Sequence, residues 1–127
     1  MAKPLIRILL AIAGGLGSSL AYPREGLWPV IFLSVIALLL SVRGLSFWRA
    51  FWVGYLGGFG FYVSQIEWMS LYLGPVPLLA LSTLEAFFFG FGMALIAKVW
   101  RWLETKPRRI LRGVQISLAI AVIWTAR

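Results

Sequence analysis

Two glutamates, Glu67 and Glu85, are the side chains of this sequence whose chemistry most needs an explanation. Each lies within a long apolar segment, and a carboxylate placed in such a segment is costly and is by default a functional candidate. At helical spacing Glu85 shares a face with Ser82 and Phe89, so this face can meet the polar face that carries Glu67. Two interpretations stay open: a polar cavity open to the outer leaflet that binds a lipid head group or peptide, and a hydrogen-bonded glutamate that ties helices together. Glu67, near the end of its segment, can also reach water.

The residue types that are missing exclude several kinds of active site. The sequence contains no Cys, no His and no Asp, and its only carboxylate side chains are four glutamates. A cysteine nucleophile, a Cys/His zinc site and a Ser-His-Asp triad are therefore impossible within these residues. Two glutamates without a nucleophile do not define a hydrolase. We expect no catalytic residue, no metal site and no cofactor in this chain.

The overall composition is that of a membrane protein. Of 127 residues, 61% are hydrophobic and 13% are charged, and the mean hydropathy is +0.92. A soluble domain is nearer half apolar and a quarter charged, and a soluble fold of this size has too few polar residues here to cover its surface. Disordered chains are charged and poor in apolar residues. We therefore expect an all-α membrane protein, with no soluble domain.

Five apolar segments are candidates to cross a bilayer, whose hydrocarbon core of about 30 Å needs roughly 20 helical residues. They are residues 5–21, 27–42, 51–72, 76–99 and 110–126. The connections between them are residues 22–26, 43–50, 73–75 and 100–109, and each contains Pro or Gly, which are turn signals. The first segment also has features of a cleavable signal peptide, but Pro23 and another apolar segment follow the candidate cleavage site too closely. The prediction is a polytopic bundle of about five transmembrane helices formed by residues 1–127.

Charged and aromatic residues give this bundle an orientation. With the N-terminus in the cytoplasm, ten of the twelve basic residues lie on the inner side, and only Arg24 and Arg127 lie outside, as the positive-inside rule requires. All seven tryptophans fall at or near the ends of segments, as in an interfacial aromatic belt. The net charge of +8 is thus explained by topology, and we expect no nucleic-acid partner. The inner basic residues are Lys3, Arg7, Arg43, Arg49, Lys98, Arg101, Lys106, Arg108, Arg109 and Arg112.

A cluster of glycines in the third segment predicts close helix packing. Gly54 and Gly58 are separated by one helical turn, and Gly57 and Gly60 lie on a neighbouring face. Small residues at this spacing let another helix approach closely. A dinucleotide-binding fingerprint is excluded, because no strand precedes these glycines and the last position of the motif is not glycine.

The order of four motifs resembles the N-terminal membrane region of apolipoprotein N-acyltransferases, especially actinobacterial ones. The motifs are Ala-Tyr-Pro-Arg-Glu-Gly-Leu-Trp-Pro at 21–29, Arg-Ala-Phe at 49–51 with Gly-Tyr-Leu-Gly-Gly-Phe-Gly-Phe at 54–61, Ile-Glu-Trp at 66–68 followed by Tyr-Leu-Gly-Pro-Val-Pro at 72–77, and Ile-Trp-Thr-Ala-Arg at 123–127. The last is similar to the start of a longer family segment. The resemblance implies a multi-pass protein of the bacterial cytoplasmic membrane. It also implies an enzyme that moves an acyl chain from a phospholipid to the amine of a diacylglyceryl-cysteine on a lipoprotein.

In that family the chemistry is done by a Glu-Lys-Cys set on a nitrilase-like domain that follows the membrane region. This sequence has no Cys, so no catalytic residue carries over, and we expect a truncated N-terminal membrane domain that is inactive alone. Its expected partners are phospholipids and, in a full-length enzyme, the lipoprotein. The residues expected to shape a lipid or substrate cavity are Glu67, Trp68, Tyr72, Gly74, Pro75 and Glu85.

Two alternatives stay open beside the acyltransferase. One is a non-catalytic membrane anchor or partner of a polyprenol-phosphate mannose synthase, because a similar membrane region accompanies that enzyme in some actinobacteria. The other is a small carrier or channel, which rests on Glu67 and Glu85 alone.

Overall fold

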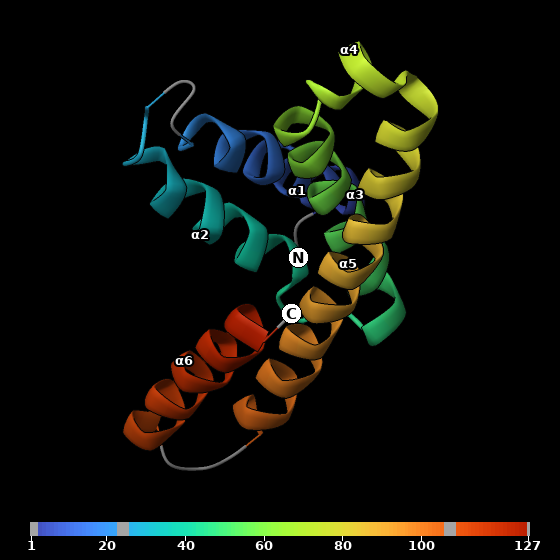
Figure 1. Cartoon of the computed structure of the whole chain (residues 1–127). Coiled ribbons are helices and arrows are strands. Elements are labelled where there is room, and N and C mark those ends of the chain that lie inside the picture. Colours follow the sequence, from blue (N-terminus) through green and yellow to red (C-terminus); the bar gives the residue numbers. More distant parts are fainter. Residues whose placement is uncertain (1–2, 23–25, 106–108, 127) are drawn as a thin grey trace.

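The described part of the chain, residues 3–22, 26–105 and 109–126 of a computed structural model, is all helical and contains no strand. Its six helices are α1 (Pro4–Leu20), α2 (Val30–Val42), α3 (Phe47–Gln65), the short α4 (Met69–Leu73), α5 (Pro75–Glu104) and α6 (Arg109–Ala126). Figure 1 shows α3 packed along α5, α1 and α2 beside α3, and α6 alongside the C-terminal half of α5. Of the described helices, α6 lies close to α5 only.

Backbone contact between α1 and α3 depends on glycine at both helices. A Cβ atom placed on Gly15 would overlap the carbonyl group of Gly57, and a Cβ on Gly57 would lie 2.8 Å from the carbonyl oxygen of Ala11. Real Cβ atoms do not come so close to backbone atoms. One turn further along α3 the helices diverge, because a Cβ on Gly60 would lie 3.7 Å from Leu16, an ordinary contact distance.

The crossing of α3 and α5 is equally close. A Cβ on Gly54 would lie 2.6 Å from the Cβ of Met93, and a Cβ on Gly90 would lie 2.8 Å from the carbonyl oxygen of Phe51. Met93 is fully buried in the hydrophobic core, which α5 shares with α2 and α3. Small residues here replace side-chain contact with backbone contact, which is how helices associate closely in membranes.

The single helix expected over residues 51–72 is interrupted, and this is a correction to the sequence-based prediction. Helix α3 ends at Gln65, and Ile66 has φ −110° and ψ 16°, outside the helical region. The carbonyl of Ile66 accepts from the amide of Met69 at 2.9 Å, and that of Glu67 accepts from the amide and hydroxyl of Ser70 at 3.0 and 2.7 Å. These three-residue turns replace the longer helical hydrogen bonds, so Glu67 lies in a turn between α3 and α4.

The connection expected at residues 100–109 is also shorter than predicted, because α5 continues to Glu104. The indole Nε1 of Trp100 donates to Glu104 Oε1 at 3.0 Å, a contact one helical turn along the same face that supports the last turns of the helix. With 30 residues, α5 is about 45 Å long at 1.5 Å per residue.

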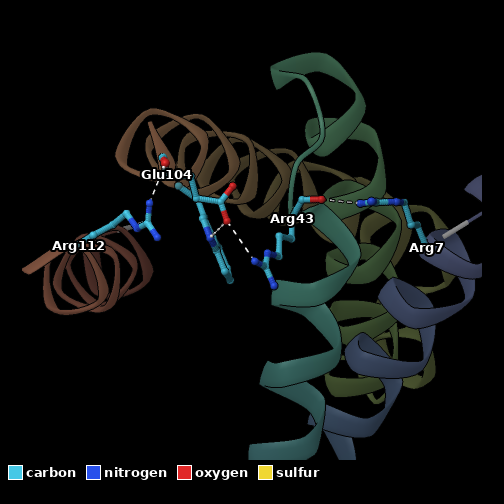
Figure 2. Close-up of polar contacts among 5 residues, drawn as sticks. Arg7, Arg43, Glu104 and Arg112 are labelled. Carbon is cyan, nitrogen blue, oxygen red and sulfur yellow. Dashed lines mark hydrogen bonds and ion pairs between the residues drawn. The ribbon is translucent and has the colours of Figure 1, made fainter. Parts of the chain in front are cut away.

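A cluster of polar side chains ties four helices together at one end of the molecule (Figure 2). Arg7 of α1 donates to the carbonyl oxygens of Arg43 and Ser41, at the end of α2, at 2.7 and 3.1 Å. The guanidinium of Arg43 forms an ion pair with Glu104 of α5 at 3.2 Å, and Arg112 of α6 donates to the backbone carbonyl of Glu104 at 3.0 Å. The starts of α1 and α6 and the ends of α2 and α5 therefore lie at the same end.

One of the described helices, α5, is both long and apolar enough to cross a bilayer by itself. Helices α1 and α2 and the segment Leu111–Ala126 of α6 are apolar but shorter. At 17 and 13 residues, α1 and α2 are about 25 and 20 Å long at the rise of an α-helix.

Candidate functional site

Glu85 lies in a cleft between α3, α5 and α6, about 15 Å along α5 from its start at the rise of an α-helix. The cleft has a volume of ≈ 150 Å³ and is lined by Tyr62 of α3, Glu85, Phe88 and Phe89 of α5, and Trp124 of α6. Glu85 is half-buried. No hydrogen bond or ion pair joins its carboxylate to any residue that the structure describes, and none of the described residues that line the cleft is basic. The cleft therefore presents one carboxylate among aromatic rings.

Phe89 connects the aromatic walls of this cleft. Its ring lies edge-on to Trp124, with centroids 5.9 Å apart, and edge-on to Tyr62, with centroids 6.5 Å apart. Such arrangements are favourable, because the positive edge of one ring meets the negative face of the other. A Cβ on Gly58 would lie 2.7 Å from the Cβ of Phe89. The glycine thus lets α3 come close enough for Tyr62 to reach the cleft.

The other five residues predicted to shape a substrate cavity form a separate group around α4. Trp68 and Tyr72 are exposed, with ring centroids 6.3 Å apart. Gly74 has φ +83°, a conformation that glycine adopts without strain, and Pro75 begins α5 at a position that needs no amide hydrogen. None of these residues, nor Glu67 in the preceding turn, lines the cleft of Glu85. The structure therefore divides the predicted set into an exposed group and a cleft.

A wider apolar groove of ≈ 400 Å³ separates α2 from α6. Val35 and Leu39 of α2 line one side, and Ile120, Ala121 and Trp124 of α6 line the other. Trp124 therefore contributes to both the groove and the Glu85 cleft. Trp124, for which the sequence predicts a place in an interfacial aromatic belt, is half-buried in the structure and packs against Phe89.

Four residues of the cleft, Tyr62, Phe88, Phe89 and Trp124, were not predicted as site residues. The spacing of Glu85 and Phe89 by one turn was a usable signal on α5. No comparable signal marks Tyr62 and Trp124, because their place depends on how α3 and α6 are packed against α5. Ser82, expected on the face of Glu85, is fully buried, and its hydroxyl makes no hydrogen bond among the described atoms. It does not line the cleft.

The described residues of the cleft are suited to binding a ligand. Among the described residues no group of three or more His, Cys, Asp or Glu side chains can hold a metal ion. The described lining of the cleft offers one carboxylate and aromatic faces. Carboxylates and aromatic faces share an attraction for cations.

Comparison with known proteins gives a single family. Residues 14–127 match the model of the apolipoprotein N-acyltransferase N-terminal domain. The chain is 36% identical over 122 residues to the apolipoprotein N-acyltransferase of Pseudomonas putida, 36% over 129 residues to that of Azotobacter vinelandii, and 34% over 97 residues to that of Mycolicibacterium smegmatis. These matches cover 93%, 93% and 72% of this chain, but only 23%, 23% and 16% of the relatives, so the chain spans about a quarter or less of their length. The chain therefore belongs to the apolipoprotein N-acyltransferase family, in which it corresponds to the N-terminal domain.

Proposed function

We propose that this chain is the membrane-embedded N-terminal domain of an apolipoprotein N-acyltransferase, crossing the bacterial cytoplasmic membrane with α1, α2, α3, α5 and α6. The observation that supports this most is the exposure of large apolar side chains on all five helices. Leu9, Leu33, Leu56, Val76 and Leu118 are examples, and Leu33 is 70% exposed. An apolar surface of this extent is a liability in water and is the expected surface in lipid.

The same proposal places the N-terminus in the cytoplasm. The polar cluster of Arg7, Arg43, Glu104 and Arg112 gathers basic residues at one end of the bundle. Arg101 adds to it by donating to the carbonyl oxygen of Leu45, just before α3, at 3.2 Å. An end rich in Lys and Arg faces the cytoplasm, where anionic lipids attract it. The end of α6 then faces outward.

This orientation is tested with reporters fused to the chain in a bacterial host. Alkaline phosphatase fused after residue 127 is expected to be active, because this enzyme folds only outside the cytoplasm. Green fluorescent protein fused after residue 105 is expected to fluoresce, because it folds in the cytoplasm. The exchanged pair of fusions, with each reporter at the other position, serves as the control. Fluorescence from a fusion after residue 127 would overturn the topology.

We further propose that the domain carries no acyl-transfer chemistry and instead anchors and guides lipid-linked substrates. The chain has no Cys, and no Ser, Thr or Lys is among the described residues that line the Glu85 cleft. In the complete enzyme the helices would hold the catalytic part at the membrane surface and admit the phospholipid donor and the lipoprotein acceptor from the bilayer. The chain alone is then inactive.

A chimeric enzyme tests this function directly. The corresponding region of the Pseudomonas putida relative is replaced by residues 1–127, and N-acylation of a diacylglyceryl lipopeptide is measured in phospholipid micelles. We expect the chimera to transfer the acyl chain and the purified 127-residue chain to transfer none. The parent enzyme is the positive control. A folded chimera without activity would argue for the anchor role in a different enzyme, and activity of the chain alone would contradict the proposal.

A further inference from the structure

We propose that the Glu85 cleft binds the ammonium group of a lipid-linked substrate. This inference deepens the function proposed above and rests on it, because it names the chemical group that the membrane domain would recognise. The first argument is charge. The Glu85 carboxylate has no hydrogen bond or ion pair with a described residue, and no Lys or Arg is among the described residues that line its cleft. A carboxylate at membrane depth normally has a cationic or hydrogen-bonding partner, and a bound cation would supply it.

The second argument is the aromatic lining, which selects the kind of cation. Tyr62, Phe88, Phe89 and Trp124 surround the carboxylate. Aromatic faces attract an organic ammonium within about 6 Å of the ring centroid, and such aromatic cages bind substituted ammonium groups. Calcium and magnesium prefer several oxygen ligands, whereas this cleft offers the two oxygens of one carboxylate and a tyrosine hydroxyl. The lining therefore favours an organic ammonium over a metal ion.

The third argument is size and surroundings. A volume of ≈ 150 Å³ admits a small aminoalkyl group and not a whole lipid. Trp124 forms part of this cleft and also of the apolar groove between α2 and α6, which has ≈ 400 Å³. An amphiphile whose ammonium group lies beside Glu85 can therefore place a hydrocarbon chain in the neighbouring groove, which shares Trp124 with the cleft. This shared residue is why we infer a lipid-linked ligand.

Two molecules in the proposed reaction carry such a group. One is a phospholipid with an ethanolamine head group, and the other is the lipoprotein acceptor, whose terminal cysteine bears a free α-amine next to its diacylglyceryl chains. Both present an ammonium group close to hydrocarbon chains. The inference is that the cleft binds this shared ammonium group. The experiment below distinguishes the phospholipid from the lipoprotein acceptor as its source.

The test compares ligands with and without a free ammonium group, using the full 127-residue chain in detergent micelles and native mass spectrometry to count bound ligand. One arm pairs phosphatidylethanolamine with its N-acetylated form. The other arm pairs a diacylglyceryl-cysteine lipopeptide with its N-acetylated form. We expect the chain to prefer the free amine by at least about tenfold in one arm, and that arm identifies the source.

Glu85→Gln removes the charge with little change in shape, and we expect it to abolish the preference by weakening binding of the free amine alone. Trp124→Leu is a second variant of the same cleft, and we expect it to reduce the preference. Trp52→Leu is its matched control, because Trp52 is exposed on α3 and lines neither the cleft nor the groove. Helicity measured by circular dichroism shows that each variant is folded.

Equal binding of free and acetylated ligands by the unaltered chain, in both arms, would overturn the inference. A preference that persists in folded Glu85→Gln would overturn it too. If that variant does not fold, the test is the comparison of Trp124→Leu with Trp52→Leu. Equal preferences of these two variants for the free amine over the acetylated ligand would overturn the assignment of binding to the cleft. An active chimera without any ammonium preference would refute this inference alone, whereas a preference in a chain whose chimera is inactive would refute only the proposed acyltransferase role.

Discussion

Valine at position 15 is expected to prevent α1 from packing against α3. A Cβ on Gly15 would overlap the carbonyl group of Gly57, and this obstacle is backbone, which cannot rotate away as a side chain can. Overpacking of a close contact costs about 1–3 kcal/mol and at times more, and we place Gly15→Val at or above about 3 kcal/mol. The measurement is the midpoint of unfolding in sodium dodecyl sulfate, followed by circular dichroism.

The control for this variant is Gly60→Ala, which adds a methyl group on the same face of the bundle. A Cβ at Gly60 would lie 3.7 Å from Leu16, so there is room, and alanine is a better helix former than glycine by about 1 kcal/mol. We expect Gly60→Ala to be neutral or stabilising. Equal unfolding midpoints for Gly15→Val and the unaltered chain would show that the two helices do not cross at this point.

Phe89→Ala is expected to be the most disruptive truncation in the contact between α5 and α6. Phe89 is 5% exposed and its ring joins Trp124 of α6 to Tyr62 of α3. Truncating a buried phenylalanine costs about 3–5 kcal/mol through lost contacts and the cavity left behind. Because α6 lies close to no described helix other than α5, we expect it to lose its docked position before the other helices unfold.

Disulfide trapping measures this loss of docking. Two cysteines, one on α5 and one at a facing position on α6, are cross-linked in the otherwise unaltered chain and in Phe89→Ala, and the result is the ratio of the two cross-linking rates. Phe87→Ala is the matched control on the same helix, because Phe87 is 52% exposed and its truncation opens no internal cavity. A rate ratio near one for Phe89→Ala, with the same unfolding midpoint, would contradict the role of Phe89.

Much of the helical pattern is predictable from the sequence, because its causes are local. Runs of apolar residues form helices, and Gly74 followed by Pro75 ends one helix and begins the next. Two of the boundaries that differ from the prediction, after α3 and at the end of α5, lie beside side chains that bond across a turn. Ser70 donates to the carbonyl of Glu67 beside the interruption after α3, and Trp100 donates to Glu104 where α5 runs on. Composition does not reveal either bond.

The candidate site was predictable only in part, for a physical reason. Glu85 stands out in the sequence because a carboxylate in an apolar segment is expensive wherever the segment packs. Tyr62 and Trp124 are ordinary membrane aromatics until α3 and α6 are placed against α5. For α3 this placement depends on where glycines permit close approach to α5, at Gly54 and Gly58. Such packing is a property of a pair of helices and cannot be read from one segment alone.

The crossing of Gly15 and Gly57 also has a consequence for how this domain is compared with its relatives. Paired positions in contact usually reveal themselves by compensating changes, a larger residue on one side matched by a smaller one on the other. Here the obstacle to a side chain at Gly15 is the main chain of Gly57, and no residue is smaller than glycine. One of the closest contacts of the bundle should therefore leave no record of covariation, and a contact map inferred from sequence variation alone would miss it.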